Sequence, residues 1–86
     1  LALGCRVYSF SDWRAAPTRN TPGVPDLYAF LPQGRGTLWI ELKRPGGVLS
    51  DEQREFLEAC RACGEPMVVG GMAELSATLR DLGVIG

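Results

Sequence analysis

The sequence predicts an α/β (α+β) domain with a mixed central β-sheet flanked by helices. Three features support this fold class: two strand-like segments joined by a short turn, a capped amphipathic helix that follows them, and a strand and helix near the C-terminal end. With 86 residues, of which 45% are hydrophobic and 22% charged, the chain has the size and composition of one folded domain. We therefore expect residues 1–86 to form a single domain.

The N-terminal part of the chain combines strand and loop signals. Cys5–Phe10 is rich in aromatic and β-branched residues and predicts a first strand. Leu1–Gly4 resembles the end of a helix closed by glycine, and the chain does not begin with Met, so we expect an upstream helix to be missing. Residues 11–25 contain several Pro and Gly residues, which predicts a long loop.

The next two strands are expected to form an antiparallel hairpin. Asp26–Leu31 and Thr37–Lys43 are separated by a Gly- and Pro-containing segment. Opposed residues in an antiparallel pair share a face, so placing Leu27 opposite Ile40 gathers one apolar face. This register leaves a loop of four residues, Pro32–Arg35. Because both faces of the hairpin are mostly apolar, we expect it to lie inside the sheet.

A capping box predicts the start of the first helix. The Ser50 hydroxyl can accept from the amide of Gln53, whose side chain can reach back, and Gly64 is the expected end of the helix. Gln53, Phe56, Leu57 and Cys60 share one stripe along this helix. A short strand at Pro66–Val69 follows, and then a helix with an apolar face formed by Leu75, Leu79 and Leu82.

The predicted hairpin gathers three charged side chains at one end of the sheet. Strand alternation puts Trp39, Glu41 and Lys43 on one face, and the register brings Asp26 opposite Glu41. Two close carboxylates repel each other unless a cation lies between them, and their hard oxygens suit Mg²⁺ or Mn²⁺. The alternative interpretation is that Asp26 caps a turn and that Glu41 and Lys43 form a solvated edge pair.

These motifs resemble the virus-type replication-repair nuclease domain, VRR-NUC, of the PD-(D/E)xK nuclease superfamily. The resemblance runs from about Gly4 to the last helix. It rests on three elements in order: Gly23-Val24-Pro25-Asp26, then Trp39-Ile40-Glu41-Leu42-Lys43, then Leu49-Ser50-Asp51-Glu52-Gln53-Arg54-Glu55-Phe56. It implies a restriction-endonuclease-like core and hydrolysis of DNA phosphodiester bonds with Mg²⁺ or Mn²⁺. It also implies branched, flap or Holliday-junction substrates and a homodimer.

The resemblance also implies a role for individual residues. Asp26 and Glu41 are expected to be metal ligands, with the backbone carbonyl of Leu42 completing the site, and Lys43 is expected to be the catalytic lysine. Gln53 matches the motif glutamine of the family, which implies a role beside the site, although a capping role alone explains it equally well. Basic residues gather in the first half of the chain, where we expect DNA contacts from Arg19 and Arg44.

Composition limits the other function classes. The net charge of −1 and the pI near 5.3 argue against broad nonspecific nucleic-acid binding, so a non-catalytic DNA-binding or dimerisation module and a protein-interaction domain remain alternatives.

No apolar run is long enough to span a membrane, and we expect a cytoplasmic protein with reduced cysteines that serve in packing. The chain has no His, which excludes a Ser-His or Cys-His nucleophile. The aromatic residues Tyr28, Phe30 and Trp39 could stack on bases, but a place in the core is the favoured interpretation.

Overall fold

The computed structural model describes residues 4–9 and 22–86. The helices and strands follow in the order β1 (Arg6–Ser9), β2 (Leu27–Phe30), β3 (Thr37–Leu42), α1 (Asp51–Cys63), β4 (Met67–Gly70) and α2 (Met72–Asp81). This is the element order that the sequence predicts. The expected helix end at Leu1–Leu3, Phe10 of the first strand and most of the expected loop, Arg19 included, lie outside the described residues.

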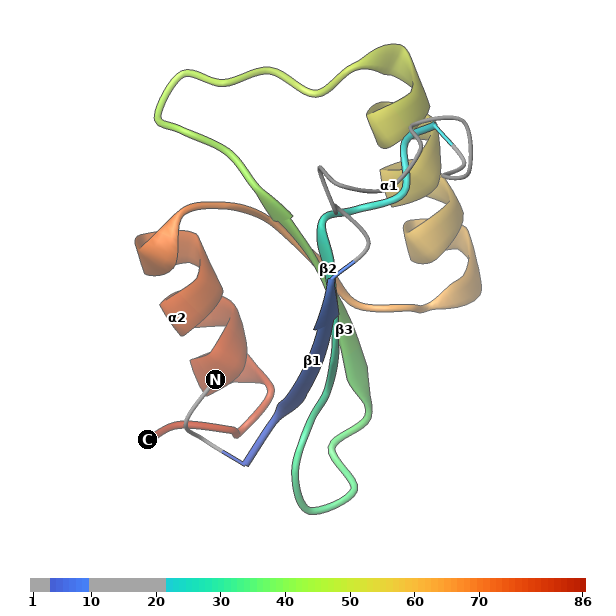
Figure 1. The fold of residues 1–86 in the computed structure, drawn as a ribbon. Coiled ribbons are helices and arrows are strands. Elements are labelled where there is room, and N and C mark those ends of the chain that lie inside the picture. The colour runs from blue at the N-terminus through green and yellow to red at the C-terminus, as the bar shows by residue number, and fades with distance from the viewer. Residues whose placement is uncertain (1–3, 10–21) are drawn as a thin grey trace.

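The four strands form one mixed sheet with the order β1-β2-β3-β4. The first three strands are antiparallel, and β4 runs parallel to β3. In Figure 1 the sheet is seen nearly edge-on, with α1 on one side and α2 on the other. The α+β fold class and the mixed central sheet flanked by helices are therefore confirmed.

The hairpin of β2 and β3 has the register predicted by parity. Leu27 pairs with Ile40, and the pairing continues to Phe30 opposite Thr37. The loop is closed by a hydrogen bond of 2.8 Å from the Leu31 amide to the Gly36 carbonyl. Both strands are interior, because β1 flanks β2 and β4 flanks β3.

The hydrophobic core lies between the sheet and α2. Fully or nearly buried residues from the strands, from the end of β2 and from α2 form one cluster: Ala29, Leu31, Leu38, Ile40, Val68, Leu75 and Leu79. The parallel pairing of β3 with β4 places Ile40 beside Val68, and α2 follows directly after β4. The apolar face predicted for the second helix is therefore the face that it buries.

The other side of the sheet is partly covered by α1. Both halves of the capping box are present: the Gln53 amide donates to Ser50 Oγ at 3.1 Å, and the Ser50 amide donates to Gln53 Oε1 at 2.8 Å. Gly64 ends the helix in the left-handed conformation, with φ 77°. Phe56 of α1 contacts Trp39 of β3 edge to face, with 5.0 Å between ring centroids.

The three cysteines differ in their surroundings. Cys60 is buried, Cys5 packs partly buried against the core, and Cys63 is exposed. The expectation that all three serve in packing is therefore wrong for Cys63, which lies on the solvent side of the last turn of α1. Within the ranges 4–9 and 22–86, no helix is long and apolar enough to cross a membrane.

Candidate active site

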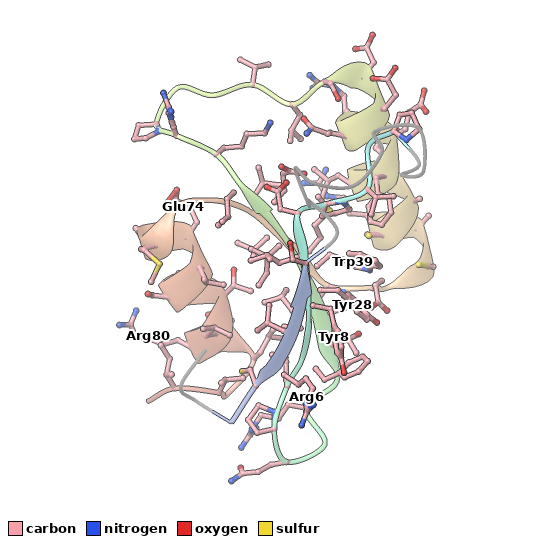
Figure 2. The ribbon with its side chains drawn as sticks, in the orientation of Figure 1. Arg6, Tyr8, Tyr28, Trp39, Glu74 and Arg80 are labelled. Atoms are coloured by element: carbon pink, nitrogen blue, oxygen red, sulfur yellow. The ribbon has the colours of Figure 1, made fainter. Side chains whose placement is uncertain are left out.

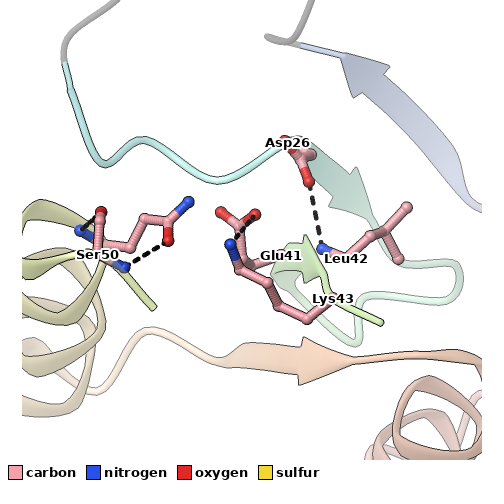
Figure 3. Close-up of polar contacts among 6 residues, drawn as sticks. Asp26, Glu41, Leu42, Lys43 and Ser50 are labelled. Atoms are coloured by element: carbon pink, nitrogen blue, oxygen red, sulfur yellow. Dashed lines mark hydrogen bonds and ion pairs between the residues drawn. The ribbon is translucent and has the colours of Figure 1, made fainter. Parts of the chain in front are cut away.

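The candidate site lies at the end of the β2–β3 hairpin that faces away from its loop. Glu41 is near the end of β3, Lys43 directly follows the strand, and Asp26 directly precedes β2. Figure 3 shows the three side chains close together, with Leu42 between Glu41 and Lys43 along the chain. The structure thus brings together the three charged residues that the hairpin register predicts.

Glu41 is a buried carboxylate with an incomplete set of partners. Its side chain is 3% exposed, and no other charged residue of the described part of the chain is buried. Its Oε2 lies 4.0 Å from Lys43 Nζ, but its Oε1 has no hydrogen-bond partner. The interpretation of Glu41 and Lys43 as a solvated edge pair is therefore wrong for Glu41, because a carboxylate without full hydrogen bonding is costly to bury.

The neighbouring carboxylate of Asp26 accepts a hydrogen bond of 3.3 Å at Oδ2 from the Leu42 amide (Figure 3). Burial of Glu41 is the main cause that raises its pKa, to about 7; the neighbouring Asp26 also raises this pKa, because it can accept a hydrogen bond from protonated Glu41 and is itself negatively charged, while Lys43 acts in the opposite direction. Near neutral pH the Glu41 carboxylate therefore binds a proton readily. A divalent cation bound between Asp26 and Glu41 would likewise relieve the repulsion between their two negative charges.

The segment before Asp26 packs against α1. Pro25 is fully buried, and Gly23 has φ +89° and lies so close to the Glu52 backbone that a Cβ there would overlap the Glu52 carbonyl. This contact joins the chain leading to Asp26 to the first turn of α1, next to Gln53. The sequence analysis placed Gly23 in the predicted loop and in the motif that ends at Asp26, but it did not predict the contact with α1.

Gln53 and the basic residues have different relations to the site. The Oε1 of Gln53 accepts the capping-box hydrogen bond from the Ser50 amide, and its Nε2 donates no hydrogen bond to the described residues. Its amide group therefore keeps donors for another partner. Arg44 is exposed in the loop after β3, next to Lys43, while Arg19 lies outside the described residues.

The donors at this site fit a hard divalent cation. Mg²⁺ and Mn²⁺ prefer carboxylate, carbonyl and water oxygens and are commonly held by one or two carboxylates. The unpartnered Oε1 of Glu41 beside the Asp26 carboxylate meets this requirement. Among the described residues, no three His, Cys, Asp or Glu side chains lie so that they could hold a metal ion together. Any further ligands from this part of the structure would therefore be backbone oxygens, beside water and substrate oxygens. An open depression on α1, lined by Asp51, Arg54, Glu55 and Glu58, includes no residue of this site.

A buried Glu, an adjacent Asp and a Lys two residues after the Glu lie together at one end of a mixed sheet, which is the arrangement expected from the resemblance to the PD-(D/E)xK nucleases. The family model for the VRR-NUC domain matches residues 10–73, and the chain belongs to this family. It is also 40% identical over 50 residues to a Fanconi-associated nuclease 1 homolog of Pseudomonas aeruginosa. This match covers 58% of the chain but 9% of that protein's length. No solved structure matches the chain significantly.

Proposed function

We propose that this domain is a DNA endonuclease that hydrolyses phosphodiester bonds with Mg²⁺ or Mn²⁺. The observation that carries the proposal is the buried Glu41 with its unpartnered Oε1, beside Asp26 and 4.0 Å from the ammonium of Lys43. Membership of the VRR-NUC family and the similarity to a Fanconi-associated nuclease homologue support the same activity.

Asp26, Glu41 and the backbone carbonyl of Leu42 would hold the cation. When bound, the ion supplies Lewis acidity, which polarises the phosphodiester and makes water a better nucleophile at neutral pH. Burial of Glu41 strengthens its electrostatic interactions, because the surrounding protein screens charge less than water does.

Lys43 is the proposed catalytic lysine. Its ammonium donates hydrogen bonds but cannot ligate a cation, so its role must differ from that of the two carboxylates. Its side chain is 23% exposed, which leaves it reachable by a substrate phosphate. There it would stabilise the negative charge that develops on the phosphate oxygens in the transition state.

The remaining predicted contacts complete the proposal. Arg44, exposed next to Lys43, and Arg19 would bind phosphates of the DNA backbone, and the free amide donors of Gln53 would act beside the site.

We also propose preference for branched DNA and a homodimer, because a two-fold pair would present two sites to one branched substrate. A cytoplasmic location fits the three unpaired thiols.

A cleavage panel tests the proposal directly. Single-stranded, duplex, flap and four-way junction DNA are incubated with the protein and Mn²⁺, and single-turnover rates are measured. We expect Mn²⁺-dependent cutting that is fastest on one of the branched substrates. Lys43→Ala should lose on the order of 10² to 10³ in rate, the effect of removing one positioned stabilising group. Lys43→Arg should rescue poorly, because the planar guanidinium is bulkier and distributes its charge differently.

Mn²⁺ titrations of the same variants separate chemistry from metal binding. Lys43→Ala should retain the Mn²⁺ affinity of the wild type, whereas Glu41→Ala should lose it. DNA binding without metal-dependent cutting would contradict the proposed activity and favour a non-catalytic DNA-binding module. Cutting by Lys43→Ala at the wild-type rate would remove the catalytic role assigned to Lys43.

A further inference from the structure

Three aromatic side chains lie together on the sheet face that carries the candidate site, and we name Tyr8, Tyr28 and Phe30 the aromatic strip. Tyr8 of β1 pairs with Tyr28 of β2, so the two side chains share a face, and strand alternation puts Phe30 on that face as well. Phe30 contacts both tyrosines edge to face, with ring centroids 5.4 Å from Tyr8 and 5.5 Å from Tyr28. The strip is thus a contiguous surface of packed rings.

The aromatic strip extends beyond the cover that α1 provides. Trp39 is contacted by Phe56 of α1, but Tyr8 and Phe30 are 44% and 46% exposed. Figure 2 shows Trp39, Tyr28, Tyr8 and Arg6 following one another along the side of the sheet on which α1 lies, with Tyr8 and Arg6 beyond the helix. The favoured expectation that aromatic residues of this strand belong to the core is therefore wrong for Phe30.

The aromatic strip is continuous with the candidate site. Asp26, Tyr28 and Phe30 are alternate residues and point to one face of the sheet. At a rise of about 3.3 Å per residue, Tyr28 lies about 7 Å and Phe30 about 13 Å from Asp26 along the strand. A ligand that follows β2 away from the site therefore crosses these rings.

The charges around the aromatic strip suit an anionic backbone. Arg6 pairs with Phe30, shares its face and is exposed, and it forms no ion pair with another of the described residues. Glu65 is the nearby acid, and its Oε1 already accepts from Thr37 Oγ1 at 2.6 Å and from the Tyr28 hydroxyl at 3.3 Å. Arg6 thus lies at one end of the line of exposed rings, and Lys43, which is paired with Glu41 at 4.0 Å, lies at the site at the other end.

We propose that the aromatic strip stacks unpaired nucleobases of a DNA strand whose phosphate backbone reaches the candidate site. Every base has a π face, so aromatic side chains bind single strands with little sequence preference, and nearby cations contact the phosphates. Paired bases inside a duplex do not expose these faces, and the strip therefore recognises the unpaired part of a substrate. This inference rests on the proposed nuclease function, since it assigns a binding surface to that substrate.

The test compares binding of two oligomers that differ only in their bases. Fluorescence anisotropy is measured with a labelled oligothymidylate and with an abasic oligomer of the same length, in EDTA so that hydrolysis is excluded. Wild-type protein should bind the base-bearing oligomer more tightly. Phe30→Ala and Tyr8→Ala should each weaken that binding by about fivefold or more, the lower end of base–aromatic stacking, while the affinity for the abasic oligomer stays the same.

Two further variants make the result specific. Phe30→Leu keeps an apolar side chain but removes the ring, so it should weaken oligothymidylate binding as Phe30→Ala does. Met72→Ala is the matched control, because Met72 is 70% exposed at the start of α2, the helix on the other side of the sheet. The Met72→Ala protein should bind both oligomers as tightly as the wild type does.

Three outcomes overturn the inference: equal wild-type affinity for the two oligomers, an equal loss for both in Phe30→Ala, or full binding by Phe30→Leu. The last result would identify an apolar protein-docking surface instead. The proposed nuclease function is judged separately by Mn²⁺-dependent cleavage. If cleavage is absent while the difference between base-bearing and abasic DNA persists, the nuclease function fails and the stacking surface stands.

Discussion

Replacing Glu41 with Gln should make the metal-free protein more stable at pH 8. The Glu41 side chain is buried, its Oε1 lacks a partner, and its pKa is raised from 4.5 to about 7. At about 1.4 kcal/mol per pKa unit, this difference corresponds to a destabilisation of about 3 kcal/mol when the carboxylate is fully ionised. A neutral amide of similar shape avoids that cost, and its Nε2 can donate to Asp26.

The pH dependence follows from the direction of this shift. Between pH 4.5 and about 7 the folded protein holds a proton on Glu41 that the unfolded chain has released. Stability therefore falls as pH rises through this window and stays low above it. The Glu41→Gln protein lacks this titration, so its advantage in stability over the wild type should grow as the pH rises from 4.5 to 7. For a domain of this size, about 3 kcal/mol is a large fraction of the total stability.

Urea unfolding at pH 5 and pH 8 in EDTA measures the effect. We expect wild type and Glu41→Gln to differ little at pH 5, and Glu41→Gln to be more stable at pH 8 by up to about 3 kcal/mol. Saturating Mn²⁺ at pH 8 should stabilise the wild type and leave Glu41→Gln nearly unchanged, since a ligand that binds the folded state adds its binding free energy. If the free energies of unfolding of the two proteins changed with pH in parallel, the reasoning would be refuted, because ionising the buried Glu41 would then not destabilise the fold.

Three further predictions concern the rest of the site and the assembly. Asp26→Asn should weaken Mn²⁺ binding in calorimetry, and an unchanged affinity would remove Asp26 from the site. Gly23→Ala should unfold at lower urea concentration than Gly36→Ala and should cut DNA more slowly: both positions have positive φ, but a Cβ at Gly36 meets nothing within 4 Å, whereas one at Gly23 meets the Glu52 backbone. Light scattering at micromolar concentration should give the mass of a dimer, and a monomeric mass with and without DNA would count against the proposed assembly.

The sequence predicted those features of the fold that depend on neighbours in the chain. The register of the hairpin followed from matching apolar residues on β2 and β3, because strand alternation leaves one register that buries them together. The limits of α1 followed from the Ser50–Gln53 capping box and from Gly64, whose interactions are local. Strand ends shifted by about one residue, as at β4, where the parallel pairing with β3 extends to Gly70.

The candidate residues were also accessible from the sequence, but their surroundings were not. Alternation determined that Glu41 and Lys43 share a face, and the register brought Asp26 beside them. The burial of Glu41, the approach of Gly23 to Glu52 and the exposure of Tyr8 and Phe30 were decided by the tertiary structure. The physical reason is that these features depend on where α1 packs across the sheet. That position is set by contacts between residues far apart in the chain, such as Trp39 with Phe56, which no local pattern specifies.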